Sequence, residues 1–325
     1  MINYILRRLL YVFPVLLGVN ILTFVLFFVV NSPDDMARMQ LGDKHVSQEA
    51  VDNWKVQRGY DLPLLWNEGV SGLSKAQETI FFKKSISLFL LDFGLSDSGR
   101  DILSDISQRM WPSLALAIPS LIVGLLVNIT FALLLIFYRG SYLEYGGLFL
   151  CIALMSISGL FYIIAGQYLV GKLLVLTPIS GYAPGTDAFK FIILPVLIGV
   201  VGGLGAGARW YRTLFLEESS RDYVRTAKAK GLSDLNVLFR HVLKNAMIPI
   251  LTGIVVVLPL LFMGSLITES FFGIPGLGSY TIDAINRQDF AIVRSMVFLG
   301  SFLYIIGLLL TDLSYTLVDP RVRLD

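Results

Sequence analysis

Residues 212–244, RTLFLEESSRDYVRTAKAKGLSDLNVLFRHVLK, form the longest charged run in a chain dominated by apolar segments. With Arg209 included, this basic stretch holds eight of the 26 lysines and arginines, against four acids. Apolar residues recur at three- and four-residue spacing on both sides of Gly231, which predicts two short helices. Gly231 suits the left-handed position just past a helix end, and Ser233 suits the N-cap of the next helix. The sequence therefore predicts a basic helix, a tight turn and a second short helix between two membrane spans.

Composition places the chain in a membrane. Of its 325 residues, 55% are hydrophobic and 15% are charged, whereas soluble domains average about 25% charged residues. No alternating pattern indicates a barrel, and several uncharged runs reach the roughly 17–25 residues that a helical span needs. The expected fold is an all-α polytopic membrane protein with six transmembrane helices. The spans are predicted at residues 9–30, 110–138, 145–171, 191–208, 245–268 and 295–311.

The distribution of charge predicts the orientation of these spans. Arg7 and Arg8 precede the first span, the 209–246 loop has a net charge of +4, and Arg321 follows the last span. The 31–112 loop instead carries twelve acids and nine lysines and arginines. By the positive-inside rule, both termini and the 209–246 loop are expected in the cytoplasm. The first apolar run is expected to be a retained signal anchor.

These features divide the chain into four parts. Residues 1–30 form an N-terminal tail and the first transmembrane helix, and residues 31–112 form an extracytoplasmic loop with amphipathic helices. Residues 113–320 form a five-helix transmembrane core that contains the 209–246 loop, and residues 321–325 form a cytoplasmic tail.

Two segments of the 31–112 loop are predicted to be helical. Residues 47–59 have the pattern of a helix with Ser47 as its N-cap. Residues 80–93 are apolar on both sides of two lysines, which predicts an amphipathic helix at the outer interface rather than a seventh span.

Small and polar residues lie inside the predicted spans. Gly199, Gly203 and Gly207 recur at four-residue spacing, which predicts a close approach of two helix backbones. Three polar side chains either line a hydrated path or join helices: Asn128, Thr130 and Gln167.

Two glycine patterns resemble nucleotide sites but lie in the wrong context. Residues 166–173 lack the Ser or Thr of a P-loop at Leu173, and no strand precedes them. Residues 203–208 fit a loose dinucleotide fingerprint without a βαβ unit. Cys151 is the single cysteine, and the two histidines are predicted on opposite sides of the membrane. The sequence therefore predicts no nucleotide, metal or catalytic site in this chain, which also disfavours an intramembrane enzyme.

The basic stretch allows three interpretations. It could be a solvated loop against anionic headgroups, a nucleic-acid binding segment, or an element that docks into a groove of a cytoplasmic partner. The helical pattern around Gly231 favours docking, because a generic loop needs no apolar helix faces separated by a glycine.

The basic stretch and several shorter motifs resemble ABC importer permeases, most closely the dipeptide/oligopeptide (peptide/nickel) transport family. The likeness extends along most of the chain. Its motifs are YVRTAKAKGL at 223–232 with His241, Leu243, Asn245 and Pro249, DFGLS at 92–96, PISGY at 178–182, Glu269-x-x-Phe272-x-Ile274-Pro275-Gly276-Leu277-Gly278, and Asp312-x-x-Tyr315-x-x-x-Asp319-Pro320-Arg321.

This resemblance implies a type I importer permease in the inner membrane, with no enzymatic activity and no cofactor of its own. The implied partners are a homologous second permease, two cytoplasmic ABC ATPase subunits that bind ATP and Mg²⁺, and an extracytoplasmic substrate-binding protein that contacts the 31–112 loop. The helix around residues 226–234 would sit in a cleft of one ATPase. The implied coupling residues are Tyr223, Arg225, Thr226, Ala227, Lys230, Gly231, Leu232, Asp234 and His241. The implied outer-gate residues are Glu269, Phe272, Pro275, Gly276 and Gly278.

The implied activity is ATP-driven import of dipeptides or oligopeptides by alternating access. Nickel, glutathione-like and sugar-derived solutes remain alternatives, as does a secondary, ion-coupled transporter with paired ionisable residues or broken helices at mid-depth. Glu269 and Asp312 lie at predicted span ends and are expected to have structural hydrogen-bonding roles. The third span departs from the family pattern, because SISG at 156–159 lacks the proline expected there.

Overall fold

The computed structural model describes residues 2–42 and 46–318, and the regular elements of this part of the chain are all helices. Its only bridge within these residues is an isolated antiparallel one between Leu95 and Asp101. The expected all-α class is therefore confirmed. The predicted tail at 321–325 and the Asp319-Pro320-Arg321 motif lie outside the described residues. The chain divides into two compact units, one of residues 2–108 and 280–309, the other of residues 109–279 and 310–318.

Five described helices are long and apolar enough to cross a membrane, and one bent helix pair would make a sixth span. They correspond one to one with the six predicted spans, and most extend further than the uncharged runs suggested. The five are Leu10–Val30, Ile102–Phe137, Gly185–Ser219, Asp234–Met263 and Phe290–Ser314, and the pair is Tyr142–Met155 with Gly159–Leu173.

The third predicted span is not one straight helix. The two halves of the pair meet at 91°. The first half is α6 (Tyr142–Met155), and the second is α7 (Gly159–Gly166) continued by η4 (Gln167–Leu173). At the break, Ser156 donates from its hydroxyl to the carbonyl of Ile152, and the backbone of Ser158 is extended. A serine hydroxyl that bonds to the carbonyl four residues earlier bends a helix without a proline.

In the first unit, the end of the first apolar helix is joined to a small packed head. Ser32 caps α2 with a reciprocal bond to Asp35, and Ser47 caps α3 as predicted. The region predicted as an amphipathic helix is helical from Phe81 to Leu90, with Leu88 buried, and it is not among the candidate spans. The elements are α1 (Ile2–Phe24), η1 (Val25–Val30), α2 (Pro33–Leu41), α3 (Gln48–Arg58), α4 (Ser74–Gln77), η2 (Phe81–Ile86) and η3 (Ser87–Leu90).

Aromatic residues form the core of this head. Phe24, Phe28, Trp54 and Tyr60 are buried together with Met36. The ring of Phe28 lies 5.3 Å from that of Tyr60, and Trp54 lies 5.6 Å from Tyr60. The described residues of the loop predicted at 31–112 thus pack onto α1 and η1, because their apolar side chains bury against those of the two helices.

In the second unit, α5 (Ile102–Phe137) and α8 (Ala188–Ser219) are the longest helices; the first seven residues of α5 belong to the first unit. Residues 102–109, just before the second predicted span, form the beginning of α5. The other elements up to residue 272 are η5 (Gly185–Asp187), α9 (Asp222–Ala229), α10 (Asp234–Val237), η6 (Leu238–Leu243), α11 (Lys244–Val257), η7 (Pro259–Met263) and α12 (Leu266–Phe272). Two later helices, α13 (Leu277–Arg287) and α14 (Phe290–Val318), each contribute residues to both units.

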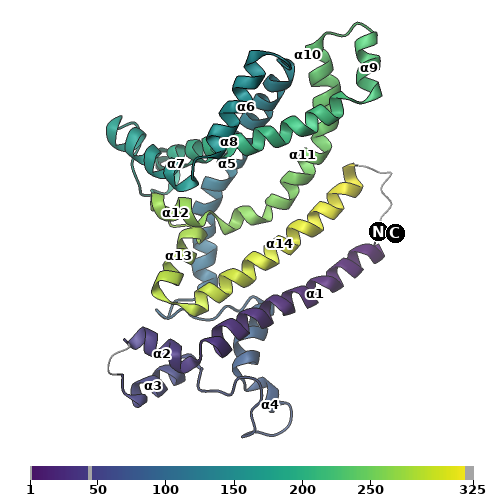
Figure 1. Ribbon diagram of the computed structural model, residues 1–325. Coiled ribbons are helices and arrows are strands. Elements are labelled where there is room, and N and C mark those ends of the chain that lie inside the picture. Colours follow the sequence, from purple (N-terminus) through teal and green to yellow (C-terminus); the bar gives the residue numbers. More distant parts are fainter. Residues whose placement is uncertain (1, 43–45, 319–325) are drawn as a thin grey trace. The chain divides into compact units, whose positions relative to one another are not determined.

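Helices α6 and α8 pack side by side (Figure 1) at a glycine that the four-residue stripe did not include. A Cβ built on Gly205 would lie 2.5 Å from the carbonyl oxygen of Cys151, so only glycine permits this approach. Of the predicted stripe, Gly207 is in close contact with the side chain of Asn128, but Gly199 and Gly203 face open space. The predicted stripe was therefore wrong for two of its three positions within this chain.

Candidate functional site

The basic stretch folds as a helical hairpin, here called the basic hairpin, made of α9, residues 230–233 and α10. It stands at the end of α8 and α11 (Figure 1). Gly231 has a φ of +78°, and the hydroxyl of Ser233 accepts from the backbone N–H of Asn236 at 3.4 Å. Both predictions for the turn are therefore confirmed. The hairpin needs this glycine because a side chain with a Cβ is disfavoured at positive φ.

The second half of the hairpin is not the separate short helix that was predicted. Helical backbone continues from Asp234 to Met263 through α10, η6, α11 and η7. The first half, Asp222–Ala229, is the separate helix, whereas the expected docking helix was placed at residues 226–234. A movement of the turn is therefore applied directly to the end of a spanning helix.

The inner face of the basic hairpin is packed into an apolar cluster. Val224 and Ala227, one turn apart on α9, are 2% and 4% exposed. They pack in one cluster with residues of three longer helices, so α9 is held as part of the helix bundle rather than as a loose loop. The cluster is Ala132 and Leu133 of α5, Tyr211 and Phe215 of α8, Val224, Ala227, Val237, Leu238 and Val242 of the hairpin and η6, and Ala246 and Ile250 of α11.

The outer face of the hairpin and of η6 exposes apolar side chains among cations. Leu232, Leu235 and Phe239 are 37%, 52% and 53% exposed. The exposed side chains of Lys228 and Asp234 form an ion pair of 2.9 Å across the turn, which ties the two helices together. An apolar tip within a basic rim is typical of a surface that enters a protein groove.

The structure locates the remaining predicted coupling residues. Arg225, Thr226 and Lys230 are exposed on the hairpin, whereas His241 lies half-buried on η6. The hydroxyl of Tyr223 donates to the carboxylate of Glu218 at the end of α8. Partial burial and this neighbouring carboxylate raise the pKa of Tyr223. Tyr223 therefore anchors α9 to α8 and is less available to a partner than Arg225.

The second candidate site is the Glu269 turn, defined as residues 264–279. Its centre is the side chain of Glu269, which is fully buried. Glu269 was predicted at the end of a span, but that span ends at Met263 and Glu269 lies on the separate helix α12. Its two carboxylate oxygens accept from the backbone N–H groups of Ser265 and Ser279, each at 3.1 Å. The carboxylate thus joins the start of α12 to the start of α13.

Burial and hydrogen bonding act in opposite directions on this carboxyl group. Burial raises the pKa of Glu269, and the donors Ser113, Ser279, Ser265 and Gly278 lower it by a smaller amount, so the pKa lies above its ordinary value. The expected structural hydrogen-bonding role fits this geometry, because the donors are backbone groups and a serine hydroxyl.

Glycines are required around Glu269 because there is no room for side chains. A Cβ on Gly264 or on Gly276 would overlap the carboxyl group of Glu269 and the hydroxyl of Ser113. A Cβ on Gly278 would lie 2.5 Å from the carbonyl carbon of Ser265. Two of the predicted outer-gate residues, Gly276 and Gly278, therefore act by leaving space.

The predicted outer-gate residues differ in burial. Phe272 is 1% exposed and packs with Ile274 against Ile192 of α8 and Leu116 of α5, whereas Pro275 is exposed. Glu269, Phe272, Gly276 and Gly278 are thus brought together in the buried part of the Glu269 turn, and Pro275 is exposed on its surface.

Sequence reasoning missed several partners of this turn. The hydroxyl of Ser113, on α5, accepts from the backbone N–H of Leu277 at 2.8 Å. The amide of Gln167 donates to the carbonyls of Ile179 and Phe271, so this residue joins segments. A lone serine beside Pro112 in an apolar span was the available signal for Ser113, but nothing in the sequence pointed to its distant partner.

A buried ion pair was also missed. Glu144, near the start of α6, binds the guanidinium of Arg212 on α8 and accepts from the backbone N–H of Gly140 at 2.6 Å. Its side chain is 6% exposed. The pair fixes α6 to α8 close to the basic hairpin, and breaking such a buried pair is costly.

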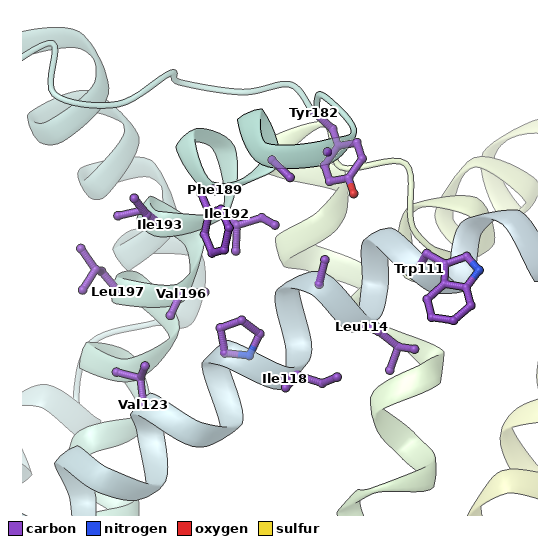
Figure 2. Close-up of a pocket in the computed structure, with 14 residues that line it drawn as sticks. Trp111, Leu114, Ile118, Val123, Tyr182, Phe189, Ile192, Ile193, Val196 and Leu197 are labelled. Atoms are coloured by element: carbon purple, nitrogen blue, oxygen red, sulfur yellow. The ribbon is translucent and has the colours of Figure 1, made fainter.

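An apolar groove of about 720 Å³ lies between α5 and α8. Figure 2 shows side chains of both helices around it, with Trp111, Leu114 and Ile118 from α5 and Phe189 and Ile193 from α8. Trp111 and Phe189 are 64% and 68% exposed. A surface of this kind in a membrane is covered by lipid or by another helix.

Comparison with known proteins places these features in a family. Residues 114–324 match the family described as "Binding-protein-dependent transport system inner membrane component", and residues 1–77 match its N-terminal counterpart. The chain is 31% identical to a probable peptide ABC transporter permease of Sinorhizobium fredii. The alignment covers 98% of this chain and 99% of the relative.

Two further relatives have been given substrates by name. A dipeptide transport system permease of Bacillus subtilis is 29% identical, with 100% of this chain and 99% of the relative covered. A glutathione transport system permease of Salmonella paratyphi A is 30% identical, with 99% of each covered. These full-length matches favour an importer permease over a secondary transporter.

Proposed function

Because the chain belongs to the family of binding-protein-dependent transport system inner membrane components, we propose that it is the peptide-translocating permease subunit of an ATP-driven importer. In this proposal it holds no cofactor, and ATP and Mg²⁺ bind two separate ATPase subunits. A second, homologous permease completes the path, and a binding protein delivers the solute. The protein works by alternating access, in which ATP binding shifts the population between two arrangements of the helices.

Peptides are the proposed substrate because the similar proteins are named for peptide, dipeptide and glutathione, itself a tripeptide. The test is uptake of radiolabelled alanyl-alanine by proteoliposomes that contain the whole assembly. Competition by other peptides, but not by Ni²⁺ or a disaccharide, is expected. If only Ni²⁺ or only the disaccharide competed, that solute and not a peptide would be the substrate.

The basic hairpin is the proposed contact with an ATPase subunit. The observation that carries this proposal is that the hairpin has one buried and one exposed apolar face. Val224 and Ala227 are buried in the bundle, while Leu232 and Leu235 are exposed at the tip. A partner that grips the tip therefore moves α5, α8 and α11 together, because all three contribute to the same cluster.

Copurification tests the hairpin. The chain is expressed with its neighbouring genes, and ATPase binding is compared between wild type, a variant lacking residues 226–234, and Leu232→Asp with Leu235→Asp. Both variants are expected to lose the ATPase while still inserting in the membrane. Leu73→Asp, at an 83% exposed leucine of another loop, is the matched control. Normal ATPase binding by both variants would overturn the proposal.

The groove between α5 and α8 is the proposed contact with the second permease. The native cysteine, Cys151, is buried, so an introduced cysteine can be crosslinked selectively after Cys151→Ser. Ile193→Cys, in the groove, is expected to crosslink to the second permease. Phe149→Cys, exposed on α6, is the control and should crosslink weakly. Crosslinking from Phe149→Cys alone would place the partner elsewhere.

In the proposed orientation, both termini and the basic hairpin lie in the cytoplasm, and residues 31–112 face the binding protein. A membrane-impermeant maleimide should label Ser98→Cys in intact cells stripped of their outer membrane, and should label Lys230→Cys only after lysis. Crosslinks to the binding protein are expected from Ser98→Cys. The reverse labelling pattern would invert the orientation.

A further inference from the structure

Arg294, in the second turn of α14, is a buried cation without a matching acid. It is 2% exposed. Its Nε and Nη1 atoms have no hydrogen-bond partner among the residues that the structure describes. The Cζ atom of its guanidinium lies 5.4 Å from the ring centroid of Phe28. A buried guanidinium that lacks an anion is strongly unfavourable, so such a group calls for a ligand.

The neighbourhood of Arg294 adds a second cation. The Nζ atom of Lys84 lies 5.3 Å from the ring of Tyr60. Burial lowers the pKa of Lys84, and the charge of Arg294 lowers it further. Two cations that face the same space repel each other, and an anion between them would relieve both the repulsion and the burial cost.

The nearby acids are already engaged by other groups. Asp97 forms an ion pair of 2.7 Å with Arg58. Asp289 accepts from the backbone N–H groups of Asp97 at 2.8 Å and of Ile292 at 3.2 Å. The exposed Asp92 accepts from the backbone N–H of Gly94 at 3.1 Å. None of these carboxylates is recorded as a partner of Arg294 within the described chain.

These side chains surround a cavity of about 470 Å³ in the first unit. Its lining includes four cations, Arg58, Lys83, Lys84 and Arg294, but only two acids, Asp92 and Asp97. The volume falls within the range of about 300–1,000 Å³ that is usual for small-molecule sites. The cavity therefore combines room for a solute with a surplus of positive charge around an unpaired guanidinium.

We propose that this cavity, the Arg294 pocket, binds the carboxylate of a small solute, with Arg294 as its forked partner and Lys84 as the second cation. The planar guanidinium matches a carboxylate with two parallel hydrogen bonds, which a lysine cannot reproduce. We assign this carboxylate to the C-terminus of a transported peptide, which every free peptide carries whatever its sequence. This assignment rests on the proposed function. An acidic side chain of a protein partner carries the same chemistry and is the other source to be distinguished.

Thermal melting of the full chain in lipid nanodiscs tests the pocket, because a ligand that binds the folded state raises the melting temperature. Three probes are titrated in a zwitterionic buffer: alanyl-alanine, its C-terminal amide, and N-acetyl-aspartic acid α-amide, which has only a side-chain carboxylate. Alanyl-alanine is expected to stabilise the wild type, and the C-terminal amide is not. A lower midpoint for alanyl-alanine than for the aspartate probe assigns the pocket to free peptides, and the opposite order assigns it to an acidic side chain.

Variants connect the response to Arg294. Arg294→Gln and Arg294→Lys are expected to weaken alanyl-alanine binding by about tenfold to hundredfold, the range for hydrogen bonds to a charged group. Arg287→Gln, at an exposed cation at the end of α13, is the matched control and should bind as the wild type does. Without ligand, Arg294→Gln should melt above the wild type, because it removes a buried unpaired charge.

Three results would overturn the proposal: an equal response in Arg294→Gln, an equal response to the C-terminal amide, or no response to either carboxylate. Lys84→Gln gives a second test that leaves Arg294 in place, and it should weaken binding to a smaller extent. Peptide uptake by the wild-type assembly separates the two claims. Uptake without carboxylate binding at Arg294 rejects only the pocket, whereas absence of uptake rejects the proposed function.

Discussion

The basic hairpin and the Glu269 turn both change the direction of the chain at glycine, but they use polar groups in opposite ways. In the hairpin, the charged side chains are exposed and the buried residues are apolar, as Val224 and Ala227 show. In the Glu269 turn, the carboxyl group itself is buried and accepts hydrogen bonds from the backbone around it. The first arrangement leaves a surface available to a partner, whereas the second fixes the ends of helices relative to each other. Substitutions should therefore affect assembly at the hairpin and stability at the turn.

The largest effect is expected from Glu269→Ala. The change leaves the backbone N–H groups of Ser265 and Ser279 without their acceptor, and each unsatisfied donor costs about 1–3 kcal/mol. We expect a loss of about 3 kcal/mol or more in the free energy of unfolding, measured by denaturant titration in detergent. Asp283→Ala, at an exposed acid of α13, should change stability little. Equal losses in the two variants would mean that the buried network has no special role.

A smaller loss is expected from Gly278→Ala. Its Cβ would lie 2.5 Å from the carbonyl carbon of Ser265, and overpacking of this kind costs about 1–3 kcal/mol. Gly203→Ala adds the same atom into open space within a helix and should be neutral or stabilise by up to about 1 kcal/mol. The two variants are compared by melting temperature. If Gly203→Ala were the more damaging, that glycine would be packed against a partner that the isolated chain lacks.

The contrast between the two regions also explains what the sequence could predict. The hairpin depends on local chemistry, and Gly231 and Ser233 specify its turn and cap within a few residues. The Glu269 turn depends on Ser113, which is more than 150 residues away in the chain. No periodicity or spacing encodes such a pairing, so the motif predicted the residues of the turn but neither their burial nor their partners.

Span boundaries show the same limit. Apolar runs predicted where the membrane helices lie, but most helices extend beyond the runs, as the 35 residues of Gly185–Ser219 show against the predicted 191–208. Hydropathy reports which residues tolerate lipid, whereas helix ends are set by caps and backbone bonds. Hydropathy did not predict the 91° break for this reason, because the two halves together are apolar enough to count as one span.

The buried carboxyl group of Glu269 should make the stability of the protein depend on pH. Because the pKa of Glu269 is raised by burial above its ordinary value of 4.5, the folded protein holds this proton to a higher pH than the unfolded chain does. Its stabilising contribution is complete below pH 4.5 and is lost as the pH rises through the folded pKa, at up to about 1.4 kcal/mol per pH unit. Melting temperatures measured from pH 4.5 to 8 should therefore fall.

Glu269→Gln should flatten this decline, because its side chain does not titrate. Burial raises the pKa of Asp289 as well, so Asp289→Asn is needed to isolate the part of the decline that comes from the first unit. A decline that persists unchanged in Glu269→Gln would show that other groups govern it.

The smallest change in stability, and the most selective change in activity, is expected from Gly231→Ala. No atom lies within 4 Å of the added Cβ, so the only cost is the left-handed backbone, about 1–2 kcal/mol. The strain should distort the tip of the basic hairpin, and Gly231→Asp should abolish transport while membrane insertion remains intact. Peptide-stimulated ATPase activity of the assembly measures the effect.

Gly140→Ala is the matched control, since Gly140 has a φ of +81° in open space but lies outside the hairpin. Gly231→Asn should retain more activity than Gly231→Ala, because asparagine tolerates this conformation. If Gly140→Ala reduced ATPase activity as much as Gly231→Ala, backbone strain in general would explain the loss, and the tip would have no specific role in coupling.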